Sequence, residues 1–135
     1  MISLHLARWL RDAGLAWEPA PGDEFLVPDH GMDDRVFVIA EMVVQVRHLP
    51  TGTIIALNGT TEWALDSLML SETLWMPRED QLREVLGDAF LSLERRAEDW
   101  AVRVRLSDGT TTGVVASTPV DAWAKAVLVH LRGPD

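Results

Sequence analysis

The sequence contains no cysteine and no tyrosine, and it contains a single lysine, Lys125. Without cysteine there is no disulfide framework, no thiolate zinc site and no cysteine nucleophile. The HExxH, GxSxG, Walker A and GxGxxG patterns are also absent, which excludes the common metalloprotease, hydrolase, nucleotide and dinucleotide motifs. We therefore expect no cofactor and no catalytic residue of a known motif.

Long apolar runs are missing as well. A membrane-spanning helix needs about 18 or more apolar residues, and the most apolar segment, residues 122–131, contains Lys125 and His130. The start of the chain has no basic region followed by an apolar one, so we expect no signal peptide. These observations predict a cytoplasmic protein that does not enter the membrane.

Positive charge is scarce relative to negative charge. The chain has 21 acidic and 12 basic residues, a net charge of −9. Such a chain is repelled by phosphate backbones and by anionic lipid surfaces, so we expect neither nucleic acid nor membrane as a partner. The length of 135 residues and the apolar content of 47% predict one domain, residues 1–135, with its own core.

The patterns along the chain predict helices at both ends and strands between them. Ser3 is a helix cap, and Thr118 followed by Pro119 begins a second helix that ends near Arg132. The last helix is apolar nearly all round, so it either lies across a sheet and under another element or forms an oligomer interface. We expect extended segments at residues 25–27, 36–46, 53–57, 73–76, 90–95, 100–106 and 111–116.

A hairpin turn is expected at Pro50–Gly52, and apolar residues alternate with arginines along 102–106, which predicts one buried and one solvated face. Short helices are expected at 60–68 and 77–86. The second should bury Leu82, Val85 and Leu86, and Glu79 in its first turn should interact favourably with the helix dipole.

This order predicts an α+β fold. It consists of one antiparallel sheet of about five to six strands, with the N-terminal and C-terminal helices packed against it and a short helical insertion in the middle.

Six tryptophans are spread along the chain. An indole buries a large apolar area but needs a partner for its N–H, so it either anchors a core or lines a binding surface. We expect Trp9, Trp75 and Trp123 to be packing residues, because each sits at an element end or on an apolar helix face. Trp17 lies in a loop and Trp63 in a first helical turn, so these two are the candidates for a binding surface.

Three carboxylates are candidates for binding or acid–base chemistry. Glu62 and Asp66 are four residues apart on one expected helix, and Glu41 interrupts an apolar strand. The alternative is that Glu62 interacts with its helix dipole, Asp66 is solvated, and Glu41 lies where the strand opens to solvent.

The segment from Asp29 to Asp34 combines carboxylates with a histidine. Asp29, His30, Asp33 and Asp34 are competent metal ligands. Their spacing matches no EF-hand, however, and Asp and Gly are ordinary turn residues. We favour a solvated loop without metal.

Two stretches, Asn58–Asp66 and Trp75–Arg83, resemble a family of short, uncharacterised bacterial proteins, together with the segments Ser3–Pro19 and Thr118–Trp123. The family is mainly actinobacterial and partly phage-related, and some members carry an automatic pilus-assembly label. The resemblance covers most of the chain. It implies a grouping and no activity or site.

The sequence favours a small, acidic, non-catalytic protein that acts through protein–protein interaction or self-association, for instance as a homodimer. One alternative is an enzyme that uses His30, Glu41, Glu62 and Asp66. The other is a small-molecule binder with a pocket lined by Trp17 and Trp63.

Overall fold

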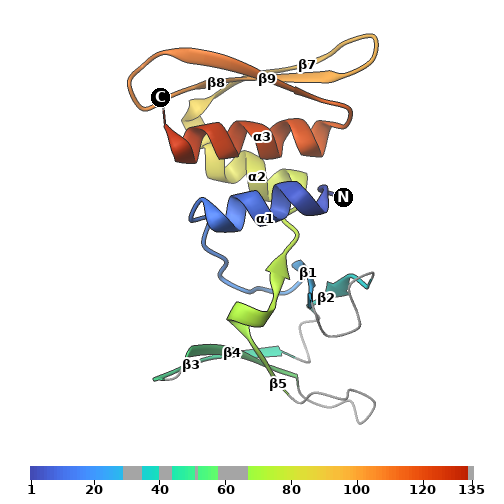
Figure 1. Ribbon diagram of the computed structural model, residues 1–135, viewed down its shortest axis with the longest axis vertical. Helices are drawn as coiled ribbons and strands as arrows, with labels where there is room; N and C mark the ends of the chain where they lie inside the picture. The colour runs from blue at the N-terminus through green and yellow to red at the C-terminus, as the bar shows by residue number, and fades with distance from the viewer. Residues whose placement is uncertain (29–34, 40–43, 51, 58–66, 134–135) are drawn as a thin grey trace. The chain divides into compact units, whose positions relative to one another are not determined.

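The computed structural model describes residues 1–28, 35–39, 44–50, 52–57 and 67–133 (Figure 1). The chain divides into two compact units. We call Met1–Ala16 together with Pro77–Asp135 the terminal unit, and Trp17–Met76 the central unit. Each unit is described by itself, and the expected single domain stays a prediction.

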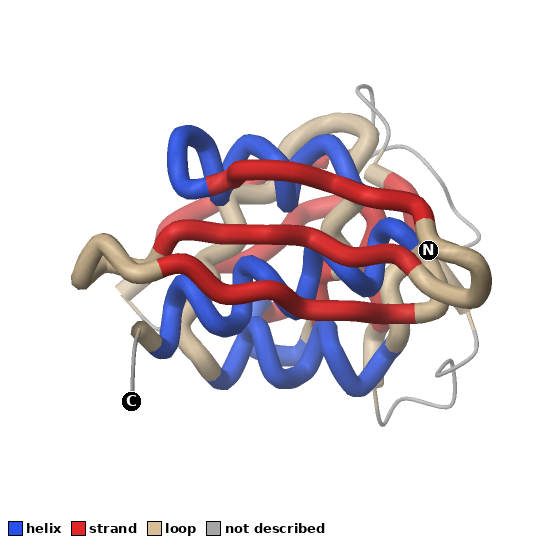
Figure 2. The backbone as a smooth tube through the Cα atoms, turned by 90° about the horizontal axis from the view of Figure 1, so that it is seen from above, coloured by secondary structure: helices blue, strands red, loops and turns tan. Residues whose placement is uncertain are grey.

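The terminal unit is built from one antiparallel sheet and three helices. The strands are β7 (Phe90–Arg95), β8 (Trp100–Arg105) and β9 (Thr111–Ala116), in the order β7-β8-β9. The helices are α1 (Leu4–Asp12), α2 (Glu79–Leu86) and α3 (Pro119–Arg132), and a 3-10 turn, Gly87–Ala89, follows α2. α3 packs against β8 and β9 and also against α1 and α2. Figure 1 shows the sheet, α3 and the other two helices as successive layers, and Figure 2 looks onto the sheet with helices behind it.

α3 begins and ends where the sequence predicts. The Thr118 hydroxyl accepts a hydrogen bond from the Asp121 N–H at 3.3 Å, and Pro119 occupies the first turn. Gly133 ends the helix with a φ of 75°, a conformation that glycine adopts without strain. Nearly every side of α3 is buried, which confirms that this apolar helix lies across a sheet and under other elements.

The sheet has one buried and one exposed face, as the alternation predicts. Val102 and Val104 on β8 are fully buried, whereas Arg103 and Arg105 between them are exposed. Since successive strand residues point to opposite faces, the valine face is the one that α3 covers.

Trp123 is the main anchor between α3 and α2. Its side chain is 1% exposed, and its Nε1 donates to Glu79 Oε1 at 3.0 Å. The indole also packs on Phe90, with ring centroids 4.4 Å apart, and the Arg83 guanidinium lies 5.6 Å from the ring centroid. The packing role expected for Trp123 is confirmed. The partner Glu79 was expected only to interact with the α2 dipole.

A buried carboxylate joins the start of α1 to α3. Asp121 Oδ1 accepts a hydrogen bond from the Ser3 N–H at 2.8 Å, and Asp121 Oδ2 accepts one from the Ser3 hydroxyl. Asp121 is 9% exposed. Ser3 occupies the cap position of α1, but its hydroxyl makes no capping bond to that helix. The hydroxyl donates to the Asp121 carboxylate instead, and hydrogen bonds to carboxylates are among the stronger ones in proteins.

We predict that Ser3→Ala lowers the free energy of unfolding by about 1–3 kcal/mol, because it removes a hydrogen bond to a buried charge. Urea denaturation followed by tryptophan fluorescence measures this loss. Ser117→Ala is the matched control, because Ser117 is exposed next to the cap of α3, and we expect it to stay within ~0.5 kcal/mol of the wild type. Equal losses in the two variants would contradict the role of Ser3.

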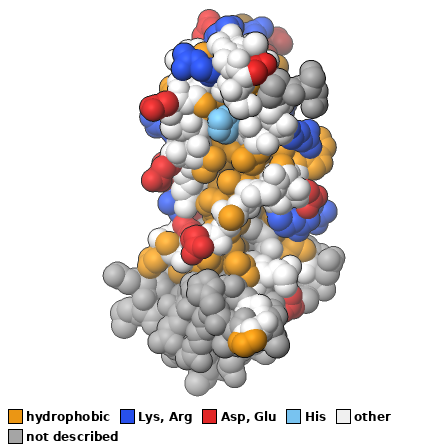
Figure 3. Space-filling model, turned by 90° about the vertical axis from the view of Figure 1, so that its left-hand side faces the viewer, with side chains coloured by type: hydrophobic (Ala, Val, Ile, Leu, Met, Phe, Trp, Pro, Cys, Tyr) orange, Lys and Arg blue, Asp and Glu red, His pale blue; other side chains and the backbone are white. Residues whose placement is uncertain are grey.

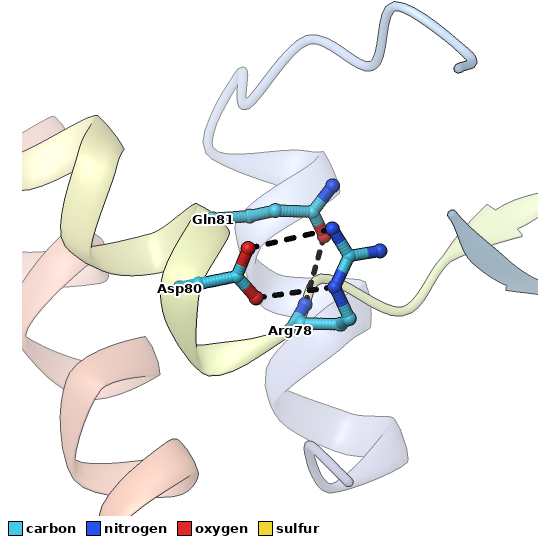
Figure 4. Close-up of polar contacts among 3 residues, drawn as sticks. All are labelled: Arg78, Asp80 and Gln81. Atoms are coloured by element: carbon cyan, nitrogen blue, oxygen red, sulfur yellow. Dashed lines mark hydrogen bonds and ion pairs between the residues drawn. The ribbon is translucent and has the colours of Figure 1, made fainter. Parts of the chain in front are cut away.

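The first turn of α2 is held by its own side chains (Figure 4). The Arg78 N–H donates to Gln81 Oε1 at 2.9 Å, and Arg78 Nε lies 3.1 Å from Asp80 Oδ1. The hydrogen bond from the Arg78 guanidinium holds the pKa of Asp80 below its ordinary value of 3.8. The predicted helix is confirmed with Leu82 and Leu86 buried, although Val85, expected beside them, is 36% exposed.

Because the folded protein lowers the pKa of Asp80, the ionised carboxylate stabilises the fold above pH 3.8, and this contribution disappears as the pH falls through the lowered pKa. We predict that a carboxyl NMR titration places the Asp80 midpoint below 3.8 and that Arg78→Gln moves it upward. Arg83→Gln, one turn further along α2, should leave the midpoint unchanged. An unchanged midpoint in Arg78→Gln would show that Arg78 is not the cause.

The central unit contains two further three-stranded antiparallel sheets. One has the order β2-β1-β6, with β1 at Glu24–Leu26, β2 at Phe37–Val38 and β6 at Leu74–Trp75. The other has the order β3-β4-β5, with β3 at Val44–Leu49, β4 at Gly52–Leu57 and β5 at Ser67–Met69. A 3-10 turn, Leu70–Glu72, precedes β6. The hairpin expected around Pro50 is confirmed by the pairing of Leu49 with Gly52.

The α+β class is confirmed, but the hydrogen bonding differs from the expected single sheet of five to six strands. The described residues form three separate sheets. The long strand expected over residues 36–46 contributes to two of them, because Phe37 pairs with Phe25 while Val44 pairs with Leu57. An apolar run reports burial and does not reveal where the chain changes its pairing partner.

The helix expected over residues 60–68 falls largely outside the described residues. Its last two positions, Ser67 and Leu68, belong to β5 and pair with β4. Local helical spacing is overridden there by pairing with a distant strand.

Candidate functional site

Trp17, the described member of the predicted binding surface, packs within the central unit. Its Nε1 donates to Asp23 Oδ2 at 2.9 Å. Its ring stacks on Trp75, with centroids 6.2 Å apart and planes 6° from parallel, and it also contacts Phe25 at 5.6 Å. The indole N–H and ring face of Trp17 are therefore engaged in packing.

The aromatic rings around Trp17 continue into the small core of this unit. Phe25 stacks on Phe37 at 5.5 Å and forms a buried cluster with Val27 and Ile39. Trp75 is half-buried, and its Nε1 has no hydrogen-bond partner within the described part of the chain. The cluster explains how a segment with so few strand residues acquires a core.

Asp23 fixes the loop that carries Trp17. Its carboxylate is 3% exposed and accepts a second hydrogen bond, from the Ala20 N–H, at 3.0 Å. The Asp23 backbone carbonyl accepts from the Ile39 N–H at 2.9 Å. A buried carboxylate is stable only when hydrogen-bonded, and here it folds residues 17–23 back onto β1. No local sequence pattern indicates this role for Asp23.

The other predicted site residues lie outside the described residues. These are Trp63, Glu62, Asp66 and Glu41, and the weak metal candidates Asp29, His30, Asp33 and Asp34. Their convergence stays a prediction. Within the described ranges, no group of three or more His, Asp or Glu side chains is placed to hold a metal ion.

Trp9 was expected to be a packing residue, but it is 48% exposed. α1 buries Leu6, Ala7 and Leu10, and successive helix residues are rotated by about 100°. Trp9 therefore falls at the edge of the buried stripe, where one side of its ring faces solvent. Its ring makes an edge-to-face contact with His5, with centroids 5.2 Å apart.

Other apolar side chains are exposed at the start of the chain. Met1 is 71% exposed and Leu4 is 40% exposed. Together with Trp9 and His5 they form what we call the α1 surface. Exposed tryptophans are typical of contact surfaces between proteins, because they dominate the binding energy of many interfaces.

Charge is distributed unevenly between the two units. The central unit contains 10 acidic and 2 basic residues, and the terminal unit contains 11 acidic and 10 basic residues. Together they account for the 21 acidic and 12 basic residues of the chain. Almost all of the net charge of −9 therefore belongs to the central unit. Figure 3 shows acidic and basic side chains interspersed with apolar ones among the described residues of one face.

Comparison with known proteins gave no relative. No protein-family model, no curated protein and no solved structure matches this chain. The resemblance to short actinobacterial proteins therefore stays a prediction.

We predict that Trp17→Phe lowers the free energy of unfolding by about 1–3 kcal/mol, because it deprives the buried Asp23 carboxylate of a donor while retaining most of the ring packing. Chemical denaturation measures the change. Trp100→Phe is the matched control: among the described residues the Trp100 N–H has no hydrogen-bond acceptor, and the Arg95 guanidinium lies 5.9 Å from its ring centroid. If both variants are equally stable, the bond to Asp23 has no structural importance.

Proposed function

We propose that this protein acts through contact with another protein chain, either a different partner or a second copy of itself, and not through catalysis. The observation that supports this proposal is the α1 surface, where Trp9 leaves about half of its indole in water. Tryptophan is enriched among the residues that dominate binding energy at protein interfaces. An exposed indole also costs free energy that a partner recovers by covering it.

The charge distribution supports the same proposal. The terminal unit is nearly neutral, so another protein can approach α1 without strong repulsion. The acidic central unit disfavours nucleic acid and anionic membranes as partners. No helix of the described residues has the length and apolar character required to cross a bilayer. We further propose a cytoplasmic location, since a chain without cysteine forms no disulfide and needs no oxidising compartment.

The test is photo-crosslinking from position 9. Trp9 is replaced by p-benzoylphenylalanine in the full chain, which is irradiated in the cells that naturally make it. We expect one reproducible adduct of defined mass. The same replacement at Val85, which is 36% exposed on α2 of the same unit, is the control and should give no such adduct.

Irradiating the purified protein alone distinguishes the two kinds of partner, because an adduct of twice the chain mass identifies a second copy. Once the partner is known, Trp9→Ala should weaken its binding by about 2 kcal/mol, or about thirty-fold. Equal yields at positions 9 and 85 would refute the proposal.

A further inference from the structure

β9 forms one edge of the sheet in the terminal unit. It pairs with β8 and is last in the strand order. The Val115 carbonyl accepts a hydrogen bond from Lys125 Nζ at 2.8 Å, so it points away from β8. Strand backbone groups alternate in direction every residue, so the N–H and C=O groups of Thr111, Gly113 and Val115 all point outward from the sheet.

This edge is well suited to accept another strand. β9 is six residues long, carries no charged side chain and keeps a regular register with β8 from Trp100 to Arg105. The opposite edge is different, because β7 has a bulge between Phe90 and Ser92 and exposes Glu94 and Arg95. Bulges and charges are devices that block strand addition, and β9 has neither within its own sequence.

Positive side chains lie on both sides of the β9 edge. Lys125 reaches it from α3. On the outer face, Arg103 lies opposite Gly113, which has no side chain. The Nη2 of Arg103 donates to Thr111 Oγ1 at 3.3 Å. Arg105 is exposed opposite Thr111. The edge is thus locally basic in a chain with a net charge of −9.

The nearest carboxylate in sequence is Asp108, in the turn between β8 and β9. It accepts hydrogen bonds from the Thr110 N–H at 2.9 Å and from the Thr110 hydroxyl at 2.6 Å. These bonds hold Asp108 within its own turn, so it does not neutralise the cations along β9.

We propose that β9 binds an extended, acidic segment of a partner protein as a fourth strand of the sheet. The partner backbone pairs with the outward groups of Thr111, Gly113 and Val115, and its carboxylates pair with Lys125 and Arg103. Lys125 leaves the Val115 carbonyl and turns to a carboxylate, so the ladder hydrogen bonds replace the one that is lost. In the free protein, the same lysine shields the edge against non-specific pairing.

Charge argues against a second copy as the occupant. Two β9 edges paired antiparallel would bring the Lys125 and Arg103 side chains of both copies together, and like charges across strands are destabilising. The proposal also concerns a different element from α1. Its outcome is therefore independent of the function proposed for the α1 surface.

The probe is a blocked eight-residue peptide, Val-Val-Glu-Glu-Val-Val-Glu-Glu, added to the full-length protein. As a strand it carries glutamates on both faces, so it can meet Arg103 on one face and Lys125 on the other. Backbone NMR and amide hydrogen exchange report on β9. We expect chemical-shift changes and slower exchange at Gly113 and Val115, with affinity that falls as salt is added. The same peptide with lysine in place of each glutamate is the charge control and should not bind.

Two variants at Gly113 test the backbone contact. Gly113→Ala should bind as the wild type does, since a Cβ there meets only the Val102 carbonyl oxygen at 3.9 Å. Gly113→Pro removes an outward N–H and should abolish binding. Lys125→Glu, which changes only a surface side chain, should weaken binding about tenfold or more and keeps the test valid if the proline variant does not fold.

Three results would overturn the proposal. They are the absence of any change at β9 with millimolar valine–glutamate peptide, equal binding of the two peptides, and protection of β9 that rises with protein concentration alone. The last result would identify a second copy as the occupant.

Discussion

The burial of α3 is the constraint on which the terminal unit depends. The sheet, α1 and α2 all pack against this helix. Three alanines, Ala122, Ala124 and Ala126, are fully buried and allow neighbouring backbones to approach closely. Trp123 fills the remaining space toward α2, and Glu79 satisfies its N–H, so the largest core side chain carries no unpaired polar atom. Elements distant in sequence are held together because they share one helix.

Buried aspartates fasten the irregular segments of both units. Asp121 accepts hydrogen bonds from Ser3 and fixes the beginning of the chain, while Asp23 accepts from Trp17 and Ala20 and fixes the loop before β1. A carboxylate removed from water needs such donors to offset its desolvation. In both places a buried carboxylate accepts hydrogen bonds from the protein, so neither carboxylate is open to a ligand.

The functional proposals follow from which tryptophans are packed, where the charges lie and which strand edge is regular. Trp17 and Trp123 serve packing, whereas Trp9 is left half in solvent. The cations of the chain are concentrated in the terminal unit, where Lys125 and Arg103 border β9, and the central unit carries most of the acidic excess. A nearly neutral surface with an exposed indole and a regular strand edge favours binding to proteins over binding to polyanions.

The sequence by itself determined the α+β class, the ends of α3, the hairpin at Pro50 and the alternating faces of β8, because caps, turns and periodicity act over a few residues. It also identified Trp123 as a core residue. The candidate site was harder to predict: most of its residues lie outside the described ranges, Trp17 donates to Asp23, and Trp9, expected to be a packing residue, is half exposed. Only the tertiary structure decided that the described strands form three sheets, that Ser3 binds Asp121 and that Lys125 donates to the Val115 carbonyl of β9. These features join residues far apart in the chain, and no local pattern records which distant partner a strand or side chain meets.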